Sequence, residues 1–446
     1  MLLTRRSLPI ATLAIVFGIC ANAQSTKPVH SPKKPGNLDA LVEQREYPEL
    51  ESVLPQETLD ETTRAYFEGV LANRRNELDR SISLLQPLIS KLEASRPDRA
   101  AVALRSLADD YVKTFRYAEA DTAYTHLLDG FTKQFTPGDR QSLKDDAATN
   151  RLLKDAPAQT VEFRSAFSLA THQSKIGTID TDLTVNGITK SWILDTGANF
   201  SVLSESLAKQ MGLKLSEGTA QTQGASGAEN RLHIAIVPEI RIGDAVVHNA
   251  VALVLDDKAL KIDLGTTKYQ IDAILGYPVL SALGQLTFSE NQVLADTGGD
   301  NSGAKIYMQQ LNPLIEYRIG GRDLLLMFDT GASNTTLTAK YYRAFPGQFV
   351  GLTPHAHGVA GAGGMKKISA YKLPELKIGI GGQTAVLKDV TVSAEPLRTD
   401  FDLLLWNHRA RPHRAVQKLY LGFQGHAFSR GEIAHQLSST CSLDLC

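Results

Sequence analysis

An internal repeat in the second half of this chain constrains its fold most strongly. An apolar run that ends in Asp-Thr-Gly occurs at 192–197 and again at 326–331, so Asp195 and Asp329 lie 134 residues apart. A turn precedes each run at the same spacing, with Gly187 and Gly321. The other matched segments follow in the same order: 224–227 with 361–364, 238–243 with 374–379, and 272–275 with 402–405. This ordered set predicts one unit that is present twice.

The composition of both copies favours β-structure. After Pro157, apolar residues alternate with polar ones, and turns carry Asn-Gly or Gly-Gly pairs, which is typical of strands joined by hairpins. We therefore expect an all-β region of two lobes. The predicted boundaries are 165–288 for the first lobe, 289–306 for a linker, 307–430 for the second lobe, and 431–446 for a C-terminal tail.

The region 38–155 has a helical pattern instead, with apolar residues at three- and four-residue steps. Part of it repeats at an offset of 39 residues, with small residues at the matched positions Gly69/Ala108 and Ser81/Ala120. This resembles tetratricopeptide repeats, although the offset exceeds their usual period of about 34 residues. Two interpretations stay open: a repeat domain whose groove binds a protein partner, or a helical bundle that packs on the rest of the chain.

The N-terminus has the pattern of an export signal. A basic pair, Arg5 and Arg6, precedes a short apolar run and the small residues of Ala21-Asn22-Ala23, so residues 1–23 are predicted to be a signal peptide. Residues 24–37 read as a linker. We expect a periplasmic or secreted protein with no membrane span after cleavage. Cys441 and Cys446 would remain, either as a small disulfide loop or as unpaired thiols in a frayed tail.

The charge composition gives no sign of a nucleic-acid partner. The chain has 47 basic and 48 acidic residues, so nothing indicates an electrostatic surface for nucleic acid or for an anionic membrane.

The repeated Asp-Thr-Gly turn carries the chemistry. The apolar strand fixes each carboxylate at the end of a buried element, and the glycine allows a tight turn with close backbone approach. A symmetric pair of such turns brings Asp195 and Asp329 face to face, where they share one proton. Such a pair acts as acid and base together. The supporting turn residues are Thr196, Gly197, Thr330 and Gly331.

These motifs resemble those of retropepsin-like aspartic proteases, over about 165–430. The resemblance implies two β-barrel lobes that pair within one chain, an open cleft for a polypeptide substrate, endopeptidase activity with Asp195 and Asp329 as the catalytic pair, and no metal or cofactor. Ala198 and Ala332 follow the turns as in the retroviral pattern, which predicts a milder acid optimum than a gastric-type enzyme has.

The resemblance also implies a glycine-rich flap over the cleft in each lobe. Surface loops without a lid function are the alternative. The expected flap residues, which would contact substrate, are Gly224, Ala225, Ser226 and Gly227 in the first lobe and Gly361, Ala362, Gly363 and Gly364 in the second.

Two features depart from the pattern. The first lobe has Gly276 after its Ile274-Leu275 pair, whereas matching Leu404-Leu405 to that pair puts Trp406 at the glycine's place. A third triplet, Asp296-Thr297-Gly298, has no apolar strand after it and reads as linker. His355 and His357 have no third partner placed by the sequence, so no metal site is expected.

The sequence thus predicts an exported aspartic endopeptidase. The alternatives are a catalytically impaired protein that binds peptides or proteins with its helical repeats and cleft, and an enzyme in which two chains pair through their first lobes.

Overall fold

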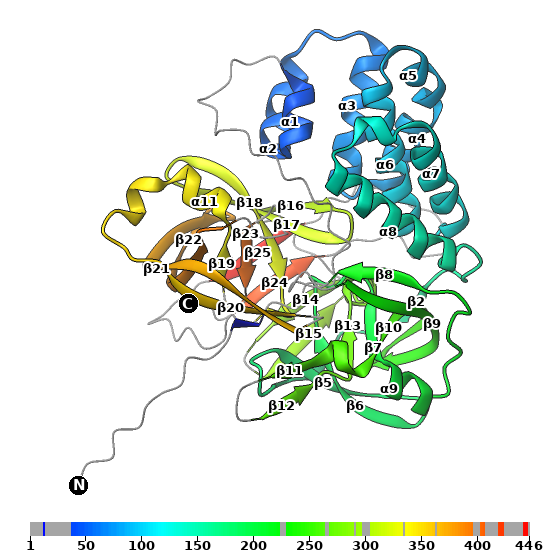
Figure 1. The fold of residues 1–446 in the computed structure, drawn as a ribbon, viewed down its shortest axis with the longest axis vertical. Helices are drawn as coiled ribbons and strands as arrows, with labels where there is room; N and C mark the ends of the chain where they lie inside the picture. The colour runs from blue at the N-terminus through cyan, green and yellow to red at the C-terminus, as the bar shows by residue number, and fades with distance from the viewer. Residues whose placement is uncertain are drawn as a thin grey trace.

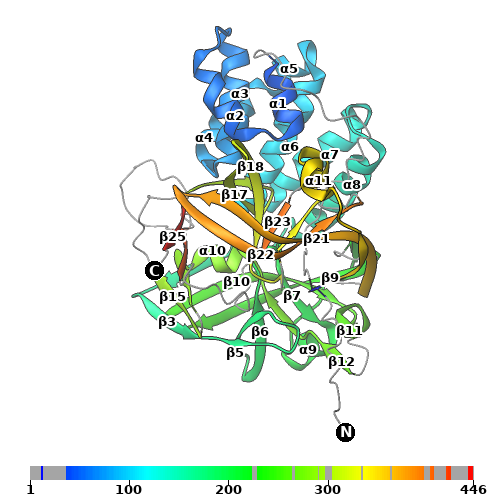
Figure 2. The same cartoon turned by 90° about the vertical axis from the view of Figure 1, so that its left-hand side faces the viewer.

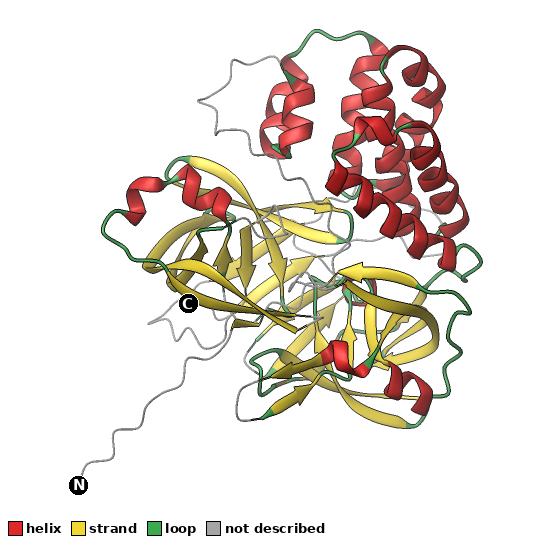
Figure 3. Ribbon diagram, viewed as in Figure 1, coloured by secondary structure: helices red, strands yellow, loops and turns green. Residues whose placement is uncertain are grey.

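The structure, a computed structural model, describes residues 12–13, 37–223, 229–263, 267–289, 291–296, 304–332, 335–361, 364–395, 402–405, 418–422 and 440–444. A helical region is followed by a β-rich region with two large sheets, which confirms the predicted fold class (Figures 1 and 3). Nearly all of the predicted signal peptide and linker lies outside these residues; the exceptions are the short strand β1 (Thr12–Leu13) and Asn37, which caps the first helix.

The helical region packs as antiparallel pairs. Asp60 and Thr136 cap two of its helices by accepting hydrogen bonds from backbone N–H groups. Gly69 allows close approach within the first pair, because a Cβ there would lie 2.6 Å from Leu85. The matched Ala108 is fully buried. The helices are α1 (Leu38–Gln44), α2 (Tyr47–Val53), α3 (Glu61–Arg74), α4 (Leu78–Leu85), α5 (Ile89–Ser95), α6 (Pro97–Lys113), α7 (Tyr117–Gly130) and α8 (Pro137–Leu153).

The first lobe is a nine-stranded sheet in the order β4-β5-β6-β13-β7-β10-β9-β8, with β2 paired to β10. Strands β5 and β9 also contact each other, which curls the sheet. Its strands are β2 (Thr160–Phe163), β4 (His172–Gln173), β5 (Ile179–Val185), β6 (Ile188–Leu194), β7 (Ser201–Ser204), β8 (Ala220–Gln223), β9 (Glu229–Ile242), β10 (Ala245–Leu255) and β13 (Ala273–Leu275); α9 (Glu205–Gln210) and α10 (Tyr277–Ala282) are its helices, and β11 (Lys261–Asp263) and β12 (Lys268–Gln270) form a separate ribbon.

The second lobe repeats this element order. An extra pairing between β17 and β21 closes its strands into a ring. Its elements are β17 (Asn312–Ile319), β18 (Arg322–Asp329), β19 (Thr336–Leu337), α11 (Ala339–Ala344), β20 (His355–Gly361), β21 (Gly364–Ile380), β22 (Gln383–Ser393) and β23 (Asp402–Leu405). Strand β1 runs parallel to β20 at the edge of this sheet.

A shared sheet joins the two lobes. Strands β3 (Phe167–Ala170), β14 (Gln285–Phe288) and β15 (Gln292–Asp296) come from the first lobe and continue through β24 (Lys418–Gly422), β25 (Thr440–Asp444) and β16 (Ala304–Gln309) into the second. In Figure 2, β25, β15 and β3 of this sheet lie at the left, below the helices.

Two predicted segments therefore need correction. The expected linker at 289–306 contains β15 and the start of β16, and the expected tail at 431–446 contains β25. Both became strands because each finds a partner far away in the sequence: Cys441 of β25 pairs with Ala304, for example. Cys446 lies outside the described residues, so the disulfide loop and the unpaired thiols both remain as alternatives.

Among the helices of the described residues, none combines the length and apolar composition that crossing a membrane requires.

Candidate active site

Both Asp-Thr-Gly turns lie where a buried strand ends. Asp195 follows β6 directly, and Asp329 is the last residue of β18. Each strand is held by a parallel neighbour, β13 for β6 and β23 for β18. The Asp195 backbone N–H donates to the carbonyl of Leu275 at 3.0 Å, which fixes the start of the first turn.

Reciprocal hydrogen bonds tie the two turns together. The backbone N–H of Thr196 donates to the hydroxyl of Thr330 (3.0 Å), and that of Thr330 donates to the hydroxyl of Thr196 (3.1 Å). Each hydroxyl in turn donates to a carbonyl of the opposite lobe, at 2.8 Å: Thr196 to Phe328 and Thr330 to Leu194. These four bonds give the two turns a twofold relationship, although 134 residues separate them.

The two carboxyl groups face each other across the glycines. A Cβ on Gly197 would lie 2.6 Å from Cγ of Asp329, and one on Gly331 would lie 2.3 Å from Cγ of Asp195. No side chain other than hydrogen fits at either position. The Oδ1 atoms accept the backbone N–H of Gly197 (2.8 Å) and Gly331 (2.9 Å), whereas neither Oδ2 accepts a hydrogen bond from a donor in the described residues.

The surroundings favour a shared proton. Both side chains are fully buried. Burial raises the pKa of Asp195 and that of Asp329 above the ordinary range of a carboxyl. The negative charge of Asp329 raises the pKa of Asp195 further. Because two carboxylates this close cannot both ionise cheaply, the pair holds one proton, and the unpartnered Oδ2 atoms are free for it and for a reacting group.

The flap segments form the matched hairpins β8–β9 and β20–β21. In the second lobe the ladder extends to Gly361 paired with Gly364; Ala362 and Gly363 lie outside the described residues, as do Gly224, Ala225, Ser226 and Gly227 of the first lobe. The structure thus places the hairpin stems and leaves the predicted lid role untested.

The residue matched to Gly276 is Leu405, which corrects the sequence match to Trp406. Leu275 pairs with Leu194 in the first lobe, and the equivalent pair in the second is Leu404 with Phe328. The next residue is Gly276 in one lobe and Leu405 in the other. A Cβ on Gly276 would lie 2.4 Å from a backbone atom of Phe200. The two half-sites are therefore not identical. Trp406 lies outside the described residues.

Ser201 is a supporting residue that the sequence did not single out. Its hydroxyl accepts the backbone N–H of Gly276 at 3.2 Å, so it ties β7 to the segment behind the first turn. A polar residue inside the otherwise apolar run 200–203 is the signal that points to it.

His355 and His357 are the two histidines near the second flap hairpin. His355 and His357 lie on β20 with ring centroids 6.3 Å apart, and burial lowers the pKa of His357 to about 4. Within the described ranges, no group of three or more His, Cys, Asp or Glu side chains is placed to hold a metal ion.

Two comparisons with known proteins found a similarity. The sequence model of the family described as aspartyl protease matches residues 181–279 and 315–405. A crystal structure described as a retropepsin-like aspartic protease from Rickettsia conorii is 18% identical, covers 31% of this chain and 93% of its own, and has a TM-score of 0.23. No curated protein matches the sequence. By the family model, each of the two lobes of the β-rich part is similar in sequence to aspartyl proteases.

Proposed function

We propose that this protein is an aspartic endopeptidase that hydrolyses peptide bonds with a water held between Asp195 and Asp329. The observation that carries the proposal is the buried, facing carboxyl pair with raised pKa values and unpartnered Oδ2 atoms. A fully buried acid pair is costly to keep unless it has a use, and perturbed pKa values cluster at functional sites.

The chemistry follows from one proton on the pair. The ionised carboxylate takes a proton from the water, and the oxygen of that water attacks the scissile carbonyl carbon. The protonated carboxyl donates a hydrogen bond and then its proton to the carbonyl oxygen, which gives a tetrahedral diol. When the C–N bond breaks, the amine nitrogen takes a proton from the protonated carboxyl. One hydroxyl of the diol gives its proton to the ionised carboxylate, so the pair again holds one proton. Atoms and charge balance without a metal or cofactor.

Replacing either carboxyl tests the proposal. Asp195→Asn and Asp329→Asn remove the acid–base pair, and we expect each to lower the rate of cleavage of an unfolded protein substrate by roughly 10²-fold or more. Asp296→Asn is the matched control, because it changes the third Asp-Thr-Gly triplet at the end of β15 and should leave the rate unchanged. Full activity in either dyad variant would refute the assignment.

A second candidate function has one observation in its favour. Leu405 at the position of Gly276 leaves the half-site of Asp329 different from that of Asp195, which suits a cleft that binds peptide without turnover. The discriminating measurement is binding of a statine-type peptide to purified protein. Binding that depends on Asp329, together with no hydrolysis of any unfolded substrate, would favour this second function.

Export is part of the proposal. The basic pair, the apolar run and the small residues of 1–23 support cleavage before Gln24 and a periplasmic or extracellular site of action. N-terminal sequencing of the protein recovered from a periplasmic fraction would test it.

A further inference from the structure

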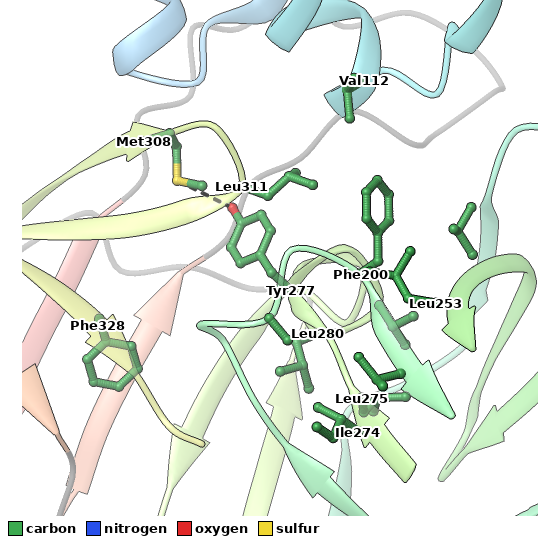
Figure 4. Close-up of a cluster of buried hydrophobic side chains, with 14 of the residues drawn as sticks. Val112, Phe200, Leu253, Ile274, Leu275, Tyr277, Leu280, Met308, Leu311 and Phe328 are labelled. Atoms are coloured by element: carbon green, nitrogen blue, oxygen red, sulfur yellow. Dashed lines mark hydrogen bonds between the residues drawn. The ribbon is translucent and has the colours of Figure 1, made fainter. Parts of the chain in front are cut away.

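The helical region meets both lobes immediately behind the first catalytic turn. A small cavity there is lined by residues of all three parts: Asp109, Val112, Tyr124, Asp146 and Asn150 from α6, α7 and α8; Asn199 and Phe200 from the first lobe; and Gln310 and Leu311 from the second. Asn199 lies only four residues beyond Asp195. Figure 4 shows Val112, Phe200, Leu311 and Tyr277 gathered at this junction.

The β16–β17 hairpin is the element that the helices hold. Gln310 Nε2 donates to Oδ2 of the buried Asp146 at 3.0 Å. Tyr47 donates to the side chain of Gln309 at 2.7 Å, and Tyr307 donates to Glu51 at 2.5 Å. From the first lobe, the Tyr277 hydroxyl contacts the sulfur of Met308 at 3.6 Å.

Gln310 has a left-handed backbone conformation, which glutamine rarely adopts. It lies first in the two-residue turn between β16 and β17, with φ at +53°. The described residues contain four other two-residue hairpin turns, and their first positions are occupied by Asn186, Gly243, Gly320 and Gly381, which are the residue types such a turn prefers. A glutamine here goes against local preference, and departures of this kind concentrate at functional positions.

The hairpin leads directly to the second catalytic aspartate. Strand β17 pairs along its length with β18, and Leu314 lies opposite Met327, two residues before Asp329. On its other side, the helical region reaches the first lobe, because α8 packs against β8, the first strand of a flap hairpin. The helical region thus bonds to the hairpin beside the strand that carries Asp329, and it also packs on the lobe that carries Asp195.

We infer that the helical region contributes to catalysis. Asp146, acting through Gln310, is a positioning residue that fixes where Asp329 lies relative to Asp195. This rests on the proposed peptidase function. Asp146 and Gln310 do not touch substrate. They hold the β16–β17 hairpin, whose strand β17 pairs with β18, so that the reciprocal bonds of Thr196 and Thr330 form at the correct separation. Misplacement of about 1 Å in a catalytic site can cost roughly 10²-fold in rate.

The Gln310→Gly variant distinguishes an effect on the position of Asp329 from an effect on the stability of the protein. Glycine suits the positive φ, so the melting temperature should hold or rise. Loss of the Asp146 contact should lower kcat roughly ten- to hundredfold with KM unchanged. Asn186→Gly is the matched control: it makes a similar turn change, but the side-chain bond that it removes, from Asn186 to the Met211 carbonyl, lies within the first lobe, so kcat should stay at the wild-type value. Asp146→Asn, which keeps an acceptor oxygen, should retain more activity than Asp146→Ala.

Amide hydrogen exchange at Thr196 and Thr330 supplies a readout that needs no activity. Gln310→Gly should accelerate exchange at both amides, and Asn186→Gly should not. If wild-type protein cleaves no substrate, the peptidase proposal fails, but the exchange measurement still tests whether Gln310 positions the two turns. A Gln310→Gly variant with unchanged exchange, or with wild-type kcat in an active enzyme, would overturn the inference, as would a kcat loss that merely follows a lower melting temperature.

Discussion

Asp195 and Asp329 each bind a backbone N–H through one oxygen and leave the other oxygen for a proton or a reacting group. The proposed mechanism requires one proton on the pair. Burial raises the pKa of both carboxyl groups, and the negative charge of Asp329 raises that of Asp195 further, so the pair keeps this proton at pH values where an ordinary carboxyl has lost it. The rate of cleavage should therefore peak above pH 3 and fall on the alkaline side as the last proton leaves.

The alanine after the first turn makes this prediction testable by substitution. Ala198 is fully buried beside the turn. In Ala198→Ser, a hydroxyl that donates to the ionised carboxylate should lower its pKa and shift the alkaline limb of the kcat/KM profile toward acid by up to about one pH unit. Ala208→Ser, an equally buried change on α9, is the control. A wild-type maximum below pH 3, or no shift in Ala198→Ser, would contradict this account.

Gly276 gives a residue-scale prediction about stability. A methyl group there would press on the backbone of Phe200 at 2.4 Å, and backbone cannot rotate away. We expect Gly276→Ala to destabilise the protein by about 1–3 kcal/mol and to lower activity, because Phe200 follows the first catalytic turn closely. Gly347→Ala is the control, since no atom lies within 4 Å of its added Cβ. Equal urea midpoints for the two variants would rule out this contact.

At the scale of elements, the sequence was informative where a local pattern decides the structure. The two catalytic strands and their turns could be predicted, because each is an apolar run that ends in the same short motif. Strand β23 was matched one residue out of register, because Leu403, Leu404 and Leu405 are alike and only the ladder to β18 distinguishes them. Strands β15 and β25 and the first residues of β16 were expected as linker or tail, because distant pairing, not local preference, makes them strands.

Helix α8 carries a prediction about pH and stability. Burial raises the pKa of Asp146 to about 8, while Arg105, Asp145, Asp109 and Gln310 face it. Between the ordinary carboxyl pKa and pH 8, the folded protein holds a proton that the unfolded chain has released. The free energy of unfolding should therefore fall as pH rises through this window, by about 1.4 kcal/mol per pH unit from this group.

Asp146→Asn removes that titration. Its free energy of unfolding, measured in urea from pH 5 to 8, should decline less with pH than that of the wild type. Asp155→Asn, which changes an exposed carboxyl two residues after α8, is the control, and its slope should match the wild type. Parallel slopes for wild type and Asp146→Asn would mean that Asp146 is already ionised in the folded protein.

At the scale of the whole molecule, single side chains connect parts that are far apart in the sequence. Tyr47 and Gln309 are 262 residues apart, and Asp146 and Gln310 are 164 apart. No periodicity or motif announces such contacts, which is why the sequence left the helical region as either a repeat domain for a partner or a packed bundle. The structure shows that part of its surface packs on the protein's own lobes; whether another part binds a partner stays a prediction.

The arrangement of both aspartates in one chain gives the last prediction. The Thr196 and Thr330 bonds cross between lobes of the same molecule, and the shared sheet keeps the lobes together. Specific activity should therefore not depend on protein concentration, and mixing Asp195→Asn with Asp329→Asn protein should restore nothing, because every molecule retains one defective half. If two chains paired through their first lobes, Asp329→Asn alone would be active. If chains exchanged lobes, the mixture would regain part of the wild-type rate. Either result would replace the intramolecular pair with an intermolecular one.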